Sequence, residues 1–309
     1  MGIYRAVSLQ CFFALMEWNK LFLYRFRKYC VWCVGCVGIG EATKNASPLF
    51  VCGSIMGIGF SIKATVGISL VAVVIVSLLT KGKAAVRQVW LALPAFILCI
   101  GVLSGIRAQF PCHALEEQNK MPLTYWLALG IHNNGSYPEN VEFAVECMNT
   151  PGRQQKHELA CSYISEHRAD FWSVNHIVSK ARYNFASGKM GASEFNQNSG
   201  TLMYELMNDY GKYGGYSTMI TSGYFYALLL FGMAGQLLLI CKSGGSEQKN
   251  DFLFEVSQFT VFGLFFFLML WESNNRQLYN HIPWYAIYAV GGLYGIMERL
   301  PENEKIRKA

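Results

Sequence analysis

Residues 259–297 read FTVFGLFFFLMLWESNNRQLYNHIPWYAIYAVGGLYGIM, two apolar segments joined by a short polar segment. The polar segment holds an acid, Glu272, and a base, Arg276. Its apolar neighbours approach the length that a helix needs to cross a hydrocarbon core of about 30 Å. Comparable apolar runs occupy residues 49–80, 89–106 and 223–240. This pattern predicts a chain that crosses a membrane several times.

The composition points to the same fold class. Of the 309 residues, 52% are hydrophobic and only 15% are charged, which is too apolar for a soluble domain of this size. We therefore predict an all-α polytopic membrane protein with about six to eight membrane helices. The segment 49–80 is long for one span and can form two short helices that meet at Lys63. A lysine at that depth is either a site residue or one whose ammonium reaches the interface from a helix end.

Basic residues in the short loops orient the chain. The loops at 81–87 and 241–250 and the C-terminal tail are rich in Lys and Arg, which places them in the cytoplasm. Residues 107–222 and the polar segment after Trp271 then lie outside a cell membrane. The predicted domains are one or two imperfect membrane or interfacial helices (1–47), membrane helices (48–106), a loop-rich, mostly helical extracytoplasmic domain (107–222), three membrane helices (223–298) and a cytoplasmic tail (299–309).

Several kinds of chemistry have no sequence signature here. The chain has no phosphate-binding loop for a nucleotide and no aromatic-interleaved basic surface for nucleic acid. Cys30, Cys33 and Cys36 have a metal-like spacing but lack a fourth ligand, and the six His show no metal-binding pattern. We therefore predict no metal and no cofactor. Of the cysteines on the predicted outside, Cys112, Cys147 and Cys161, two can pair, and the pairing is not readable.

Four segments, in this order, resemble bacterial GT-C glycosyltransferases of the Gram-positive type, which are related to the protein mannosyltransferases that use polyprenyl-phosphate sugars. They are GSIMGIGFSIKATVGISLVAVVIVSLL (53–79), PLTYWLALGIHNNGSYPENVEFA (122–144), ARYNFASGKMGASEF (181–195) and LMLWESNNRQLYNHIPWY (268–285). The resemblance covers residues 48–300 and implies an enzyme that transfers a sugar from a polyprenyl-phosphate donor to a protein, lipid or glycan at the cell surface.

The resemblance directs attention to two groups of residues. Arg276 and Lys63 would contact the lipid phosphate, with Glu272 holding Arg276 in place if the stretch between them is helical. Trp126, His132 and Tyr137 would form part of the sugar or acceptor surface. The alternatives are a local Glu272–Arg276 salt bridge at a helix end and, for the second group, packing within the outside domain.

The chain also departs from the family pattern. Ala64 stands where the family usually has Pro, Tyr125 where it often has His, and Gln277 where it often has Tyr. No Asp or Glu occupies an early outside loop, where such enzymes carry their general base, so the catalytic base is unassigned and the chain resembles the C-terminal portion of such an enzyme. Two other functions fit these residues: a lipid-linked polysaccharide ligase or polymerase, and a non-catalytic membrane subunit or transporter.

Overall fold

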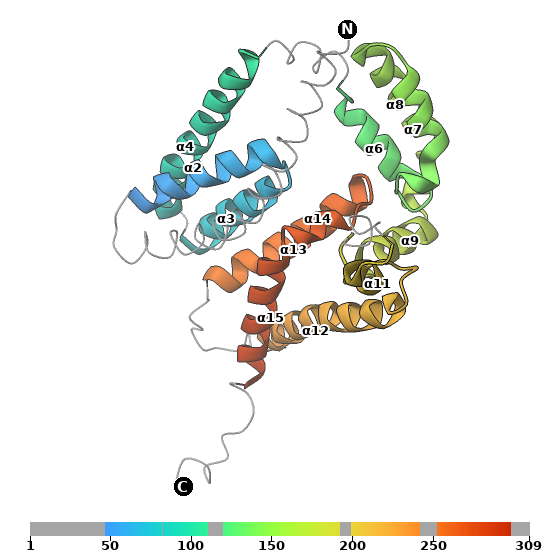
Figure 1. The fold of residues 1–309 in the computed structure, drawn as a ribbon. Helices are drawn as coiled ribbons and strands as arrows, with labels where there is room; N and C mark the ends of the chain where they lie inside the picture. Colours follow the sequence, from blue (N-terminus) through green and yellow to red (C-terminus); the bar gives the residue numbers. More distant parts are fainter. Residues whose placement is uncertain (1–46, 82, 111–119, 192–198, 242–251, 298–309) are drawn as a thin grey trace. The chain divides into compact units, whose positions relative to one another are not determined.

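The computed structural model describes residues 47–81, 83–110, 120–191, 199–241 and 252–297. These residues form helices and connecting turns without a strand, which confirms the all-α class for the described part of the chain (Figure 1). The chain divides into two compact units, Met1–Ile106 and Arg107–Ala309. The predicted helices within 1–46, the cysteines at 30, 33, 36 and 112, and the tail 299–309 lie outside the described residues.

The first unit contains three apolar helices, α2 (Ser47–Ile62), α3 (Val66–Lys81) and α4 (Lys83–Ala108). The segment 49–80 is broken into two helices, and Lys63 occupies the break. The Lys63 amide donates to the carbonyl of Gly59 and so closes α2, and its own carbonyl accepts from the amide of Val66 at the start of α3. Lys63 is half-buried.

Two glycines one turn apart bring α2 against α4. A Cβ on Gly57 would lie 2.6 Å from the carbonyl oxygen of Phe96, and a Cβ on Gly53 would collide with the carbonyl of Ala92. The Phe60 ring packs edge-on against Phe96, with 5.4 Å between the ring centroids. Small residues four apart allow the close backbone approach by which helices pack in membranes.

The second unit begins with a cluster of short helices. They are α6 (Leu123–Ile131), η1 (Pro138–Asn140), α7 (Val141–Asn149), α8 (Arg153–His167), η2 (Asp170–Trp172), α9 (Val174–Phe185) and α11 (Leu202–Met207). A small core joins α6, α7 and α8, in which the Phe143 ring stacks between Tyr125 and Tyr163 at centroid distances of 5.8 and 4.1 Å. This core fixes the position of α6, which contributes to the site described below.

Three long apolar helices follow, α12 (Gly214–Cys241), α13 (Phe252–Leu270) and α15 (Ile282–Met297), with the single turn α14 (Arg276–Tyr279) before α15. Phe225 contacts Tyr285, and Gly235 contacts Gly292, so α12 and α15 run in the same direction. The first turn of α13 instead packs beside the middle of α15, where Phe254 stacks on Tyr288. The start of α12, the end of α13 and the start of α15 therefore lie on one side of the unit (Figure 1).

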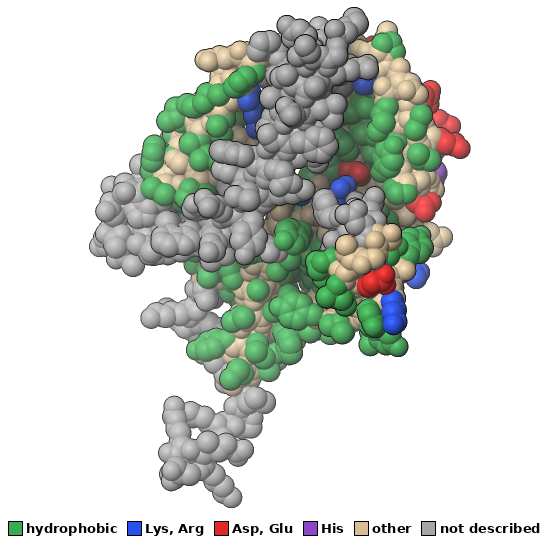
Figure 2. Space-filling model, in the orientation of Figure 1, with side chains coloured by type: hydrophobic (Ala, Val, Ile, Leu, Met, Phe, Trp, Pro, Cys, Tyr) green, Lys and Arg blue, Asp and Glu red, His purple; other side chains and the backbone are tan. Residues whose placement is uncertain are grey.

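Two of the described helices are long and apolar enough to cross a membrane, residues Gly214–Leu238 of α12 and the whole of α13, with 25 and 19 residues. Large apolar side chains on α12 are exposed, among them Ile220, Leu230 and Leu237, and Figure 2 shows hydrophobic side chains covering α12 and α15. The helices Phe50–Ile62, Val66–Thr80, Ala92–Ala108 and Ile282–Met297 are apolar but shorter. The count of six to eight membrane helices therefore stays a prediction.

The helix predicted to begin at 223 begins earlier, at Gly214, because the hydroxyl groups in its polar first turns form hydrogen bonds to the helix backbone. The hydroxyl of Thr218 donates to the carbonyl of Gly214, and that of Thr221 donates to the carbonyl of Ser217. Hydroxyls bonded back to the preceding turn remain compatible with a helix, so the apolar pattern alone underestimates its length.

Replacing Gly57 by Leu is expected to lower the stability of the first unit by about 1–3 kcal/mol, because the added side chain must enter the contact between α2 and α4. Thermal unfolding of the detergent-purified chain measures the effect. Gly101→Leu is the matched control, since a Cβ there meets no described atom within 4 Å. Equal melting temperatures for the two variants would contradict the close packing of α2 on α4.

Candidate functional site

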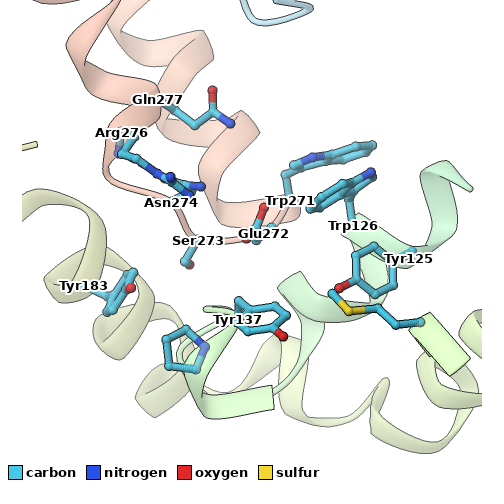
Figure 3. Close-up of a pocket in the computed structure, with 12 residues that line it drawn as sticks. Tyr125, Trp126, Tyr137, Tyr183, Trp271, Glu272, Ser273, Asn274, Arg276 and Gln277 are labelled. Carbon is cyan, nitrogen blue, oxygen red and sulfur yellow. The ribbon is translucent and has the colours of Figure 1, made fainter. Parts of the chain in front are cut away.

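A cavity of ≈ 490 Å³ lies at the C-terminal end of α13. One wall comes from the polar segment that follows α13, and the opposite wall comes from α6, the turn before η1, and α9 (Figure 3). The lining residues are Tyr125, Trp126, Tyr137, Pro138, Met148, Tyr183, Trp271, Glu272, Ser273, Asn274, Arg276 and Gln277. All of them belong to the second unit.

The Arg276 side chain is oriented by its own chain neighbours. Its backbone amide and its Nε both lie 3.1 Å from Oδ1 of Asn274 and donate to it. The backbone of Gly191, with φ +79°, packs directly against the aliphatic part of Arg276, and a Cβ at this glycine would collide with that stem. The guanidinium is therefore held at the cavity wall by a side-chain hydrogen bond and by backbone packing.

Glu272 lies on the same wall but not on the same helix as Arg276. Residues 272–274 have no helical assignment, and α14 begins only at Arg276. The condition for Glu272 to hold Arg276, a helical stretch between them, is therefore not met, because the amide of Ser273 donates to the carbonyl of Gly135 at 2.7 Å instead of continuing the helix of α13. Figure 3 shows Glu272 between Arg276 on one side and Trp126 on the other, and its side chain is largely buried.

Lys180 of α9 binds the backbone at the start of this wall. Its fully buried ammonium donates to the carbonyl of Gly130 at the end of α6, and to those of Met269 and Trp271 at the end of α13, at 2.5, 2.8 and 2.7 Å. The last carbonyls of a helix have no partner within the helix, and Lys180 supplies donors to two helix ends at once. Gly130 allows the close approach, since a Cβ there would lie 2.5 Å from the Trp271 oxygen.

A buried polar face of α9 surrounds this lysine. His176, Lys180 and Asn184 follow one another at intervals of four residues and are all buried. The amide of Asn184 donates to the carbonyl of Lys180 and to the hydroxyl of Ser273, at 3.0 and 3.1 Å. Nδ1 of His176 lies 2.6 Å from the carbonyl oxygen of Asn133 and donates to it. The polar side of α9 therefore contacts the segment after α13 through Ser273 and the turn after α6 through Asn133.

Burial also sets the protonation of groups near the cavity. It lowers the pKa of Lys180 to about 7, because a charged ammonium loses its hydration in the interior. Burial, with smaller electrostatic contributions from Cys147, Glu272 and Tyr137, raises the pKa of Tyr125. Tyr125 is thus a neutral hydroxyl group on the cavity wall near Glu272, available as a hydrogen-bond donor.

Four of the six predicted site residues, Arg276, Glu272, Trp126 and Tyr137, line this one cavity. His132 is not among its lining residues, and its Nδ1 lies 2.6 Å from Oδ2 of Asp170 instead. Lys63 lies in the first unit, at the break between α2 and α3.

Sequence reasoning missed Lys180, Tyr183 and Asn274. The apolar residues Val174 and Val178 lie on the face of α9 opposite Lys180, so apolar periodicity predicts that Lys180 is exposed. Only the meeting of α6, α9 and α13 reveals its role. Asn274 could have been suspected, because an Asn two residues before Arg276 in a turn commonly accepts from the backbone amide at that spacing.

No family model, curated protein or solved structure matches the chain.

Replacing Lys180 by Met should lower the free energy of unfolding by about 3 kcal/mol, because three buried helix-end carbonyls lose their donor and each such loss costs about 1–3 kcal/mol. Thermal unfolding in detergent measures this loss. Lys212→Met is the matched control, because Lys212 is exposed. A similar small effect for both variants would contradict the anchoring role.

The pH dependence of stability distinguishes the effect of the Lys180 amine from the effect of lost packing in Lys180→Met. A folded pKa of about 7 lies below the value of about 10.4 for an unfolded lysine. Between these values the unfolded chain holds more protons, so the stability of the wild type relative to Lys180→Met should rise with pH, and it should be constant below about pH 7. A difference that stays constant up to about pH 10 would show that the three carbonyls keep the lysine at its ordinary pKa.

Proposed function

We propose that this cavity binds the phosphate and sugar of a polyprenyl-phosphate-linked donor, and that the chain is a multi-pass membrane glycosyltransferase of the GT-C type acting at the outer face of a cell membrane. The observation that carries the proposal is the meeting of a guanidinium, a carboxylate and several aromatic rings in one cavity at the end of α13, a helix long enough to cross a bilayer. The sequence resemblance supports the same function.

The phosphate would bind Arg276. A guanidinium presents a planar fork of N–H donors that matches phosphate oxygens, and such charge-assisted pairs are stronger than neutral hydrogen bonds. The hydrogen bond from Nε to Asn274 orients the plane of the fork before a ligand arrives. Less freedom is then lost on binding, which favours affinity.

The sugar would bind the aromatic wall. Trp126, Tyr137 and Tyr183 line the cavity together with Tyr125 and Trp271. Their flat faces complement the apolar face of a sugar ring, and the tyrosine hydroxyls can bond to sugar hydroxyls. The volume of ≈ 490 Å³ falls in the range typical of small-molecule sites, which is about 300–1,000 Å³.

The lipid chain would follow the surface of α13. The cavity lies where α13 ends and α15 begins, which in a bilayer corresponds to the headgroup level. Phe262, Phe266 and Leu270 of α13 are exposed apolar side chains, along which a polyprenyl chain can extend into the hydrocarbon core. The Lys and Arg bias of the loops supports an outside location for this end and a cytoplasmic C-terminus.

Glu272 is the one carboxylate among the lining residues and is our candidate for the missing general base. It would take the proton from an acceptor hydroxyl while the acceptor oxygen forms a bond to the anomeric carbon of the sugar. The bond from that carbon to the phosphate oxygen breaks, and its electron pair leaves with the lipid phosphate, whose charge Arg276 stabilises. The products are the glycosylated acceptor and the free polyprenyl phosphate.

Replacing Arg276 by Gln should weaken binding of polyprenyl phosphate to the detergent-purified chain at least about tenfold, the loss expected when a charge-assisted pair worth about 1.5–3 kcal/mol is removed. Arg182→Gln is the matched control, because Arg182 is an exposed residue of α9 outside the cavity lining. A fluorescent polyprenyl phosphate titrated against each variant provides the measurement. Equal affinity of the two variants would exclude Arg276 as the phosphate ligand.

Glu272→Gln should bind polyprenyl phosphate within about twofold of the wild type but transfer sugar at least about 100-fold more slowly, as expected for loss of a general base. The assay follows release of polyprenyl phosphate from labelled sugar donors in vesicles with cell-envelope acceptors. Glu142→Gln, on the exposed surface of α7, is the control. Undiminished transfer by Glu272→Gln would exclude this base, and binding without any transfer by the wild type would favour a non-catalytic membrane subunit.

A further inference from the structure

Three side chains of metal-binding type meet outside the cavity, where α6, α8 and η2 come together. His132 follows the last residue of α6, His167 is the last residue of α8, and Asp170 is the first residue of η2. One ligand atom from each lies within 4.8 Å of the other two. His132 lies 35 residues before His167, and this separation is why the absence of a His-based motif led us to predict no metal.

Hydrogen bonds and ring contacts already orient the two imidazoles. Nδ1 of His167 lies 3.1 Å from the carbonyl oxygen of Tyr163 and donates to it, so Nε2 carries the lone pair that can bind a cation. The ring of His167 lies against both His132 and Tyr163, with a centroid distance of 4.2 Å in each case. A backbone carbonyl that fixes the tautomer of a histidine is a regular feature of metal sites.

The dimensions suit a small transition-metal ion. Bonds of about 2.0–2.2 Å to nitrogen and oxygen place neighbouring ligands of a tetrahedral zinc site about 3.4 Å apart, within the present span of 4.8 Å. Nδ1 of His132 and Oδ2 of Asp170 lie 2.6 Å apart, within hydrogen-bond distance. A cation that enters between these two atoms needs only a small separation of the pair, and all three side chains are half-buried rather than enclosed in the core.

We propose that His132, His167 and Asp170 form a site for a divalent transition-metal ion such as Zn²⁺, with the fourth position open to water. Two imidazoles and one carboxylate are a ligand set that zinc uses where it keeps an open position. The ion joins the ends of α6 and α8 and holds His132, whose carbonyl accepts from the amide of Gly135 in the turn that leads to Tyr137. The site stands on its own ligands and does not depend on lipid-phosphate binding in the cavity.

Cobalt provides the test, because its visible absorption reports the ligand set. We expect the purified full chain to bind one Co²⁺ that Zn²⁺ displaces, with the visible bands of a nitrogen and oxygen site and without thiolate charge-transfer bands. His167→Ala and Asp170→Asn should each weaken this binding at least about tenfold. Zn²⁺ should raise the melting temperature of the wild type but not of either variant, because an ion that binds only the folded state stabilises it.

His157→Ala is the matched control, since His157 lies on the same helix, bonds to Thr124 and is near Cys161 rather than near the cluster. It should bind Co²⁺ like the wild type. Loss of binding in His157→Ala equal to that in His167→Ala would overturn the assignment. Thiolate bands that persist in Asp170→Asn and His167→Ala would do the same, because they would place the ion on cysteines.

Discussion

The ammonium of Lys180 joins the ends of two helices that lie far apart in the chain. Its three carbonyl partners lie at the ends of α6 and α13, and one of them, Trp271, lines the cavity. Helix ends are the points where an apolar helix meets a polar segment, and the backbone there must find donors outside the helix. Because one side chain satisfies both ends, the positions of Glu272 and of the aromatic residues on α6 depend on the same contact.

The helix that carries Lys180 reverses the usual arrangement of polar and apolar faces. Its buried face holds His176, Lys180 and Asn184, whereas Val174 and Val178 are exposed to 74% and 57%. A pattern of apolar residues would predict the opposite orientation, because periodicity assumes that apolar residues face the interior. The buried face of α9 is polar because it contacts carbonyl groups and the hydroxyl of Ser273, which need polar partners.

The helical class, the break at Lys63 and a large part of the cavity could be anticipated from the sequence. Apolar runs report helices directly, and the resemblance selected Arg276, Glu272, Trp126 and Tyr137, which the fold brings into one cavity. The non-helical course after Trp271, the role of Lys180 and the meeting of His132 with Asp170 could not be anticipated. Each of these depends on contacts between segments that only the complete fold places together, and no local spacing encodes them.

The contacts of Lys180 can form only in a set order while the protein is being synthesised. Lys180 precedes Met269 and Trp271 by 89 and 91 residues, and it follows Gly130 by 50. Such distant pairings form late because the intervening chain must first be ordered. Until α13 has been synthesised, Lys180 lacks two of its three carbonyl acceptors, and its ammonium can keep its hydration and its charge. The end of α13 therefore supplies the last contacts of Lys180, a residue that is synthesised well before it.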